Sequence, residues 1–304
     1  MTLFLEQLLN GLQYGVMLFL LAAGLTLIFG IMGIINLTHG SIYMIGAYAG
    51  TYVANLTGSF YLGFPAALAA AGLTGVAVEF LVVRRLYQRD HLDQVLATFA
   101  LILIFNQLVT LIFGRPPLYA TTPAILDGSV EVLPGLFYPL YRMAIIGVGL
   151  LVAFGLYVII HKTRLGMLVR AGATNREMVR ALGVDIRLLY TAVFGLGALL
   201  AGLAGFMAGP VLAVQVGMGE QILITTFVVV VVGGVGSIRG AFFASLLIGV
   251  VDTLMQAYLP GLFRQIVIGP DADALGAGLS SMGIYVLMAI VLLIRPGGLF
   301  IAHG

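Results

Sequence analysis

Long apolar runs follow one another along almost the whole chain, separated by short polar or glycine-rich stretches. Residues 7–78 contain no Asp, Glu, Lys or Arg. A helix needs ~20 apolar residues to cross a bilayer, and the pattern predicts eight or nine such segments. They lie at 5–29, 33–56, 60–83, 94–113, 143–160, 188–214, 221–236, 241–258 and 279–294.

Composition and pattern together favour an all-α membrane protein. Hydrophobic residues make up 61% of the chain and charged residues 9%, whereas an average soluble domain carries roughly 25% charged residues. Backbone groups in hydrocarbon must be hydrogen-bonded within the protein, and the alternation of a membrane barrel is missing. We therefore expect one polytopic domain over 1–304. The short runs 221–236 and 279–294 leave tilted, broken or re-entrant segments open, as in folds built from inverted repeats.

The basic residues predict the orientation of the chain in the membrane. They gather at 84–89 and in the segment 162–187, and the positive-inside rule places both in the cytoplasm. The loops 114–142 and 259–278 should then be extracytoplasmic, and the C-terminus cytoplasmic. Three aromatic residues of the first loop are candidate interfacial anchors: Tyr119, Tyr138 and Tyr141.

The segment 162–187 is the largest hydrophilic stretch, and its pattern predicts a short surface helix. The motif TNRE at 174–177 fits a capping box with the threonine as cap, and a glycine suits the left-handed end of the helix. An apolar stripe indicates docking, either on lipid headgroups or on a cytoplasmic protein. The caps at both ends of the helix and the narrow apolar stripe favour docking on a cytoplasmic protein. The residues of this predicted docking helix are Thr174, Asn175, Arg176, Glu177, Met178, Val179, Leu182 and Gly183.

The stretch GIINLTHGSIYMIGAYAG at 33–50 places several polar residues inside an apolar run. Buried polar groups in a membrane must be paired or line water, so the stretch is either a helix-packing seam or part of a transport path. Gly46 and Gly50 fit close helix packing. The hydrogen-bonding groups of Asn36 and His39 are harder to pair within one helix. For these two residues the transport path is therefore favoured over the packing seam.

A second segment repeats this layout near the other end of the chain. Gly33, His39 and Gly40 have the same spacing as Gly233, Arg239 and Gly240. Corresponding glycine-interrupted segments indicate the transport path in transporter folds built from repeats. The candidate path residues are Asn36, Thr38, His39, Gly40, Ser41, Ser237 and Arg239.

The remaining chemistry argues against catalysis by this chain. It has no cysteine, its four histidines are scattered, and the motifs HExxH, GxSxG and GxxxxGK[ST] are absent. We therefore expect no enzyme activity, no ATP hydrolysis, no metal and no cofactor. Glu79 should pair with Arg84 near the cytoplasmic interface. Asn106, Gln107 and Asp252 should join helices by hydrogen bonds, although a proton-relay role for Asp252 leaves a proton-coupled secondary transporter open.

Several stretches resemble the LivH-type permeases of branched-chain amino acid ABC importers, in the LivH/LivM superfamily. They are GIMGIINLTHGSIYMIGAYAG, RAGATNREMVRALGVDIRLLYTAVFGLGALLAGLAG, GGVGSIRGAFFASLLIGVVDTL and the closing RPGGLF. The resemblance implies a permease domain in the bacterial plasma (inner) membrane. It also implies a LivM-like second permease, two cytoplasmic ATPase subunits and an extracytoplasmic substrate-binding protein, with 174–183 as the coupling helix; no nucleic-acid partner is expected. Leu, Ile and Val are the implied substrates, and urea, short amides or other amino acids remain alternatives.

Overall fold

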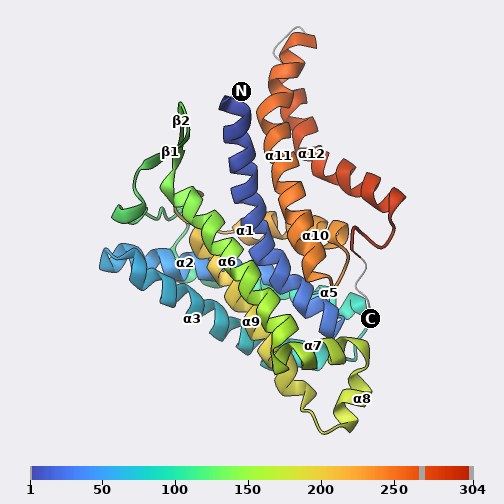
Figure 1. The fold of residues 1–304 in the computed structure, drawn as a ribbon. Helices are drawn as coiled ribbons and strands as arrows, with labels where there is room; N and C mark the ends of the chain where they lie inside the picture. The colour runs from blue at the N-terminus through green and yellow to red at the C-terminus, as the bar shows by residue number, and fades with distance from the viewer. Residues whose placement is uncertain (1, 267–270, 301–304) are drawn as a thin grey trace.

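The computed structural model describes residues 2–266 and 271–300, and these form a bundle of long helices (Figure 1). Seven helices in this part of the chain are long and apolar enough to cross a membrane, and α10 is a shorter apolar helix. The predicted polytopic all-α class is therefore confirmed. The candidate spans are α1 (Thr2–Met32), α3 (Phe60–Val78) with its continuation η1 (Glu79–Val83) and α4 (Arg84–Leu86), α5 (His91–Phe113), α6 (Leu140–Lys162), α9 (Ile186–Ala208), α11 (Ile238–Ile266) and α12 (Asp271–Ile294).

Shorter elements connect these helices. They are α2 (His39–Thr57), α7 (Arg164–Thr174), α8 (Arg176–Ala181), α10 (Met218–Gly233), the 3-10 turn η2 (Ala124–Leu126), and the strands β1 (Ser129–Leu133) and β2 (Leu136–Pro139).

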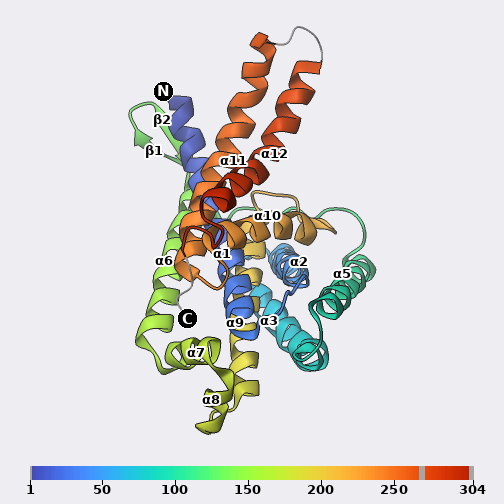
Figure 2. The same cartoon turned by 90° about the vertical axis from the view of Figure 1, so that its right-hand side faces the viewer.

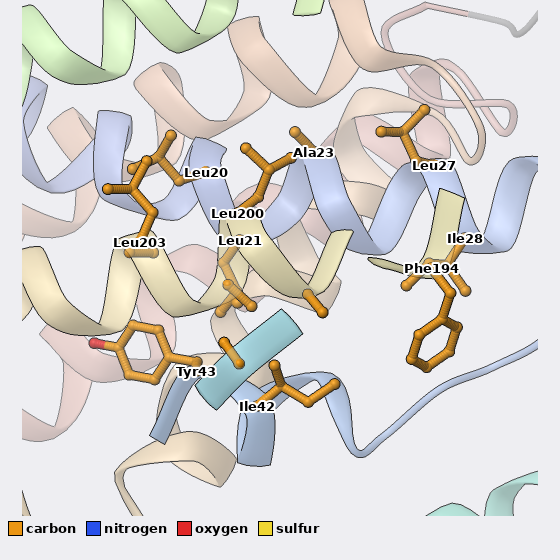
Figure 3. Close-up of a cluster of buried hydrophobic side chains, with 14 of the residues drawn as sticks. Leu20, Leu21, Ala23, Leu27, Ile28, Ile42, Tyr43, Phe194, Leu200 and Leu203 are labelled. Carbon is orange, nitrogen blue, oxygen red and sulfur yellow. The ribbon is translucent and has the colours of Figure 1, made fainter. Parts of the chain in front are cut away.

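The core of the bundle lies where α1, α2 and α9 meet (Figure 3). Helix α1 is apolar on every side and is mostly buried from Gly11 onward, as expected for a helix enclosed by other helices. Leu21 of α1, Ile42 of α2 and Phe194 of α9 are fully buried in this cluster. Helix α11 packs along the opposite side of α1, so α1 is the central element of the fold.

Two short helices lie across the bundle instead of running along it. Figures 1 and 2 show α2 and α10 crossing the middle of the molecule, at a steep angle to α1. Residues 33–36 are not helical and a turn at 37–38 leads into α2, so the apolar run at 33–56 is interrupted as its polar residues suggested. Gly217, in the left-handed region at φ 90°, precedes α10.

The predicted loop 114–142 contains two β-strands, which its Pro and Gly content does not predict. Strands β1 and β2 form an antiparallel hairpin around Gly135, whose φ is 80°. Tyr138 and Tyr141 are buried, so they are not interfacial anchors; the Tyr141 hydroxyl donates to the Met207 carbonyl at 2.9 Å. Tyr119 is exposed, so it remains a candidate interfacial anchor.

The prediction of a loop at 259–278 is wrong for most of its length. Helix α11 continues to Ile266 and α12 begins at Asp271, with only 267–270 outside the described residues. Pro260 lies inside α11, and a Cβ on Gly276 would come within 2.5 Å of its Cα. The absence of a side chain on Gly276 therefore lets α12 pack closely against α11 at the proline. Both views show α11 and α12 projecting together beyond the rest of the bundle (Figures 1 and 2).

Glu79 forms the predicted ion pair with Arg84, but it does so inside the protein. Its carboxylate is fully buried and lies 3.0 Å from the Arg84 guanidinium. The hydroxyls of Tyr87 and Thr191 also donate to it, the latter at 2.8 Å from α9. The π-helical turn η1 begins at Glu79. A buried, fully bonded carboxylate thus ties α3 to α9, where we had expected a side chain reaching toward the interface.

Candidate functional site

The polar residues at the start of α2 are organised by Asn36. Its Oδ1 accepts hydrogen bonds from the Thr38 amide, at 3.1 Å, and from the Thr38 hydroxyl. This side-chain turn lets the chain leave α1 and re-enter helix at His39, as Asn commonly does in turns. Asn36, Thr38, His39, Gly40 and Ser41 are all buried within the single chain.

His39 occupies the junction of α1, α2 and α9. Its Nε2 lies 3.1 Å from the Leu21 carbonyl, and a Cβ on Gly24 would come within 2.9 Å of the imidazole ring. Gly24 also touches Gly197 of α9, so small residues make room for the ring. The Nδ1 of His39 and the Nδ2 of Asn36 are buried with no hydrogen-bond partner among the described residues.

The first turns of α2 and α10 meet in direct backbone contact. A Cβ on Gly40 would overlap the carbonyl oxygen of Gly219, and a Cβ on Gly219 would overlap that of Gly40. Each helix carries the partial positive charge of its N-terminal amides. In transporters, broken helices direct such N-termini at anionic groups of the substrate. The site therefore combines two helix N-termini with two unsatisfied polar side chains.

Ser237 and Arg239 lie elsewhere. Ser237 caps α11, its hydroxyl accepting from the Gly240 amide at 3.1 Å. Arg239 is exposed and its guanidinium lies 3.3 Å from His161 Nε2 at the end of α6. The two glycine-interrupted segments are therefore alike in layout, since each connects two helices, but His39 and Arg239 have different surroundings.

The predicted docking helix is present as α8, with changes in detail. Its cap is Asn175, whose Oδ1 accepts from the Met178 amide at 3.0 Å. Thr174 ends α7 and its hydroxyl donates to the Arg170 carbonyl. Thr174 therefore does not cap the helix, and the predicted capping box of Thr174 with Glu177 is wrong. Gly183 has φ 85°, which confirms the predicted left-handed end.

The apolar stripe of the docking helix is divided between two surroundings. Val179 is buried against the protein, whereas Met178 is 58% and Leu182 77% exposed. The prediction that all three share one docking face is therefore wrong for Val179. Glu177 is exposed, and the side chain of Arg176 lies outside the described part of the structure.

A polar cavity separates α8 from the end of α1. Its volume is about 420 Å³, and it is lined by residues 30–33, residues 172–175 and Glu177. Gly33, which lines this cavity, is also the first residue of the non-helical segment between α1 and His39 of α2. One short segment, residues 33–38, thus connects the wall of this cavity to the start of α2.

Two further acidic groups lie within the membrane helices. Glu220, in the first turn of α10, accepts a hydrogen bond from Asn106 of α5, so the predicted helix-joining role of Asn106 is confirmed. Glu220 is not among the residues predicted above, although an acid at the start of an apolar run is a signal in the sequence. Asp252 bonds Gln256 within α11 at 2.8 Å, not a residue of another helix. Tyr14 of α1 is a further polar neighbour of Asp252.

Comparison with known proteins gives a consistent result over nearly the whole chain. Residues 7–293 match the family described as branched-chain amino acid transport system, permease component. The chain is 29% identical to the high-affinity branched-chain amino acid transport system permease protein BraD of Pseudomonas aeruginosa, covering 97% of this chain and 95% of that protein.

Other relatives agree with this assignment. The chain is 27% identical to the permease protein LivH of Salmonella typhimurium, again covering 97% and 95%. It is also 27% identical to a probable LivH of Methanocaldococcus jannaschii, covering 94% and 89%. No solved structure matches this chain significantly. The chain therefore belongs to the family of permease components of branched-chain amino acid transport systems.

Proposed function

We propose that this chain is a permease subunit of an ABC importer and forms half of the path for branched-chain amino acids. The match of the whole membrane domain to this family supports the proposal. The names of the relatives support Leu, Ile and Val as substrates. ATP is hydrolysed on two separate cytoplasmic subunits. A LivM-like second permease completes the path, and an extracytoplasmic binding protein delivers the substrate.

The exposed docking helix supports the assignment of the ATPase contact. Met178 and Leu182 present apolar surface to solvent, on the same short helix as the exposed Arg180 and outside the candidate membrane spans. Burying such surface against a partner is favourable by about 25 cal/mol per Å². The helix also borders the cavity that leads to Gly33. In this proposal α8 transmits ATPase movement to the start of α2, and the segment 162–187 and the C-terminus are cytoplasmic.

Leu182→Asp is expected to abolish transport while leaving the permease folded. The side chain is mostly exposed, so the aspartate disturbs the ATPase contact and not the permease core. Val179→Asp is the matched contrast, because a buried carboxylate at that position should destabilise the loop itself. Co-purification of the ATPase and substrate-stimulated ATP hydrolysis measure the effect. Normal amounts of bound ATPase with normal stimulation in Leu182→Asp would contradict the proposed contact.

The path through the permease is proposed to pass the junction of α2 and α10. The unsatisfied Asn36 and His39 groups and the two helix N-termini support this, since an amino acid carries both an acceptor carboxylate and a donor ammonium. All of these groups are covered in the conformation described here. Transport therefore requires α2 and α10 to separate, which exposes the polar groups to the substrate.

His39→Leu is expected to impair transport roughly tenfold with the complex still assembled, because a buried polar partner is lost from the path. Single cysteines at positions 36 and 39 provide a second readout, since the chain has no native cysteine. Aqueous thiol reagents should modify them at a rate that changes on ATP binding. Protection of both positions in every state of the ATPase cycle would show that this stretch is a packing seam.

A further inference from the structure

A groove lies between α6 and α11, at the end of α6 that leads into the segment 162–187. It has a volume of about 190 Å³, and its walls are almost wholly apolar. Leu156 and Ile160 line it from α6, Phe242 and Phe243 from α11, and Phe19 from α1 forms its floor with an edge-on contact to Phe242 at 5.1 Å.

The mouth of the groove carries a positioned cation. His161 Nδ1 lies 3.0 Å from the Tyr157 carbonyl, and its Nε2 lies 3.3 Å from the Arg239 guanidinium. These contacts assign the proton to Nδ1, so that Nε2 accepts from Arg239. Stacking on Tyr157, with ring centroids 4.5 Å apart, fixes the imidazole. His161 therefore positions Arg239 and leaves most of its five N–H donors free.

No acidic side chain among the described residues forms a salt bridge with Arg239. Within residues 2–266 and 271–300, the salt bridges join Arg84 to Glu79 and Arg264 to Asp273, and Arg239 takes part in neither. It also lies in the first turn of α11, where the helix dipole disfavours a cation. A cation held in such a place favours the binding of an anion.

The surroundings of the groove identify the source of the anion. The neighbouring side chains of α6, including Leu151 and Phe154, are apolar and exposed along a candidate membrane span. Lys162 follows His161 directly and adds a second exposed cation. Such an apolar groove, next to a lipid-facing helix surface, fits the acyl chain of a phospholipid. The cations at its mouth fit the phosphate of the same lipid.

We propose that this groove holds an anionic phospholipid, with an acyl chain along α6 and α11 and its phosphate on Arg239. The lipid is a structural ligand of the permease, separate from the amino acid path. His161 acts as a positioning residue for Arg239. The lining residues of the groove all belong to this one chain.

Native mass spectrometry of the importer, in nanodiscs with equal amounts of phosphatidylglycerol and phosphatidylcholine, tests this proposal. The wild type should retain phosphatidylglycerol about fivefold over phosphatidylcholine, the effect of one basic residue at an anionic lipid. Arg239→Gln should abolish the preference. Arg89→Gln, at another exposed cytoplasmic position, should keep it. Ala153→Phe fills the groove and should reduce retention of both lipids while Arg239 remains.

Three outcomes of the mass spectrometry would overturn the proposal. They are equal retention of the two lipids by the wild type, an unchanged preference in Arg239→Gln, and an equal loss of preference in Arg89→Gln. A cysteine at Phe243 that cross-links to the second permease in the assembled importer would also overturn it, because the groove would then be a subunit interface.

Discussion

Gly219→Val is expected to reduce transport by roughly tenfold or more, because the substitution forces apart the contact between α2 and α10. A Cβ at this position overlaps the carbonyl oxygen of Gly40, and the first neighbours are backbone atoms that cannot rotate away. Overpacking in a tight core commonly costs about 1–3 kcal/mol, and more where the backbone has to move. Uptake of branched-chain amino acids by cells that express the assembled importer measures the loss.

The control for this prediction is Gly147→Val in α6. A Cβ at Gly147 meets no atom within 4 Å, so the valine there should leave transport close to that of the wild type. Gly219→Ala should lie between the two, since it adds the Cβ without the branched methyl groups. Full transport by Gly219→Val, at normal abundance in the membrane, would show that α2 and α10 need not touch during the cycle.

Removing the carboxylate of Glu79 is expected to produce the largest loss of stability. Glu79→Gln leaves the Arg84 guanidinium without its counter-ion beside α9. Breaking a buried ion pair costs about 3–5 kcal/mol. Arg84 keeps 26% of its side-chain surface in solvent, which screens the orphaned charge and lowers the expected loss to about 2–3 kcal/mol. Thermal unfolding of the purified permease in detergent should show a clear fall in Tm.

Asp273→Asn is the matched comparison for Glu79→Gln. The Arg264–Asp273 pair is more than half exposed on both sides, and water screens exposed ion pairs so that they contribute little to stability. Its removal should therefore barely change the Tm. Thr191→Ala should lie between them, because it removes one hydrogen bond to the carboxylate. Equal melting of Glu79→Gln and Asp273→Asn would refute the view that Glu79 locks α3 to α9.

Hydropathy predicted the long helices well because both lipid and the bundle core select apolar residues. It could not predict which apolar faces meet lipid and which meet protein. Val179 and Leu182 look alike in the sequence, yet α8 packs Val179 against its own chain and leaves Leu182 outside. In the same way, Tyr138 and Tyr141 read as interfacial aromatics but are buried in the protein.

The candidate site was predicted only in part. Asn36 and His39 stood out because polar residues are rare in this chain. Their surroundings depend on backbone contacts between segments far apart in the sequence, such as Gly40 with Gly219. In a chain with 41 glycines, no local signal marks which of them meet. Arg239 was grouped with His39 by spacing, and spacing says nothing about which way each side chain faces.

The length of α11 means that a small tilt at one end displaces the other end by several ångströms. One helix runs from Ile238, beside the turn that follows α10, to Ile266 at the projecting tip (Figure 2). At 1.5 Å per residue this rod is about 42 Å long, so a tilt of roughly 10° at its base displaces the tip by about 7 Å. Pro260 removes one backbone hydrogen bond near the tip and marks the weakest point of the rod. A displacement of the projecting end would therefore be transmitted along α11 to the turn between α10 and α11 at its base.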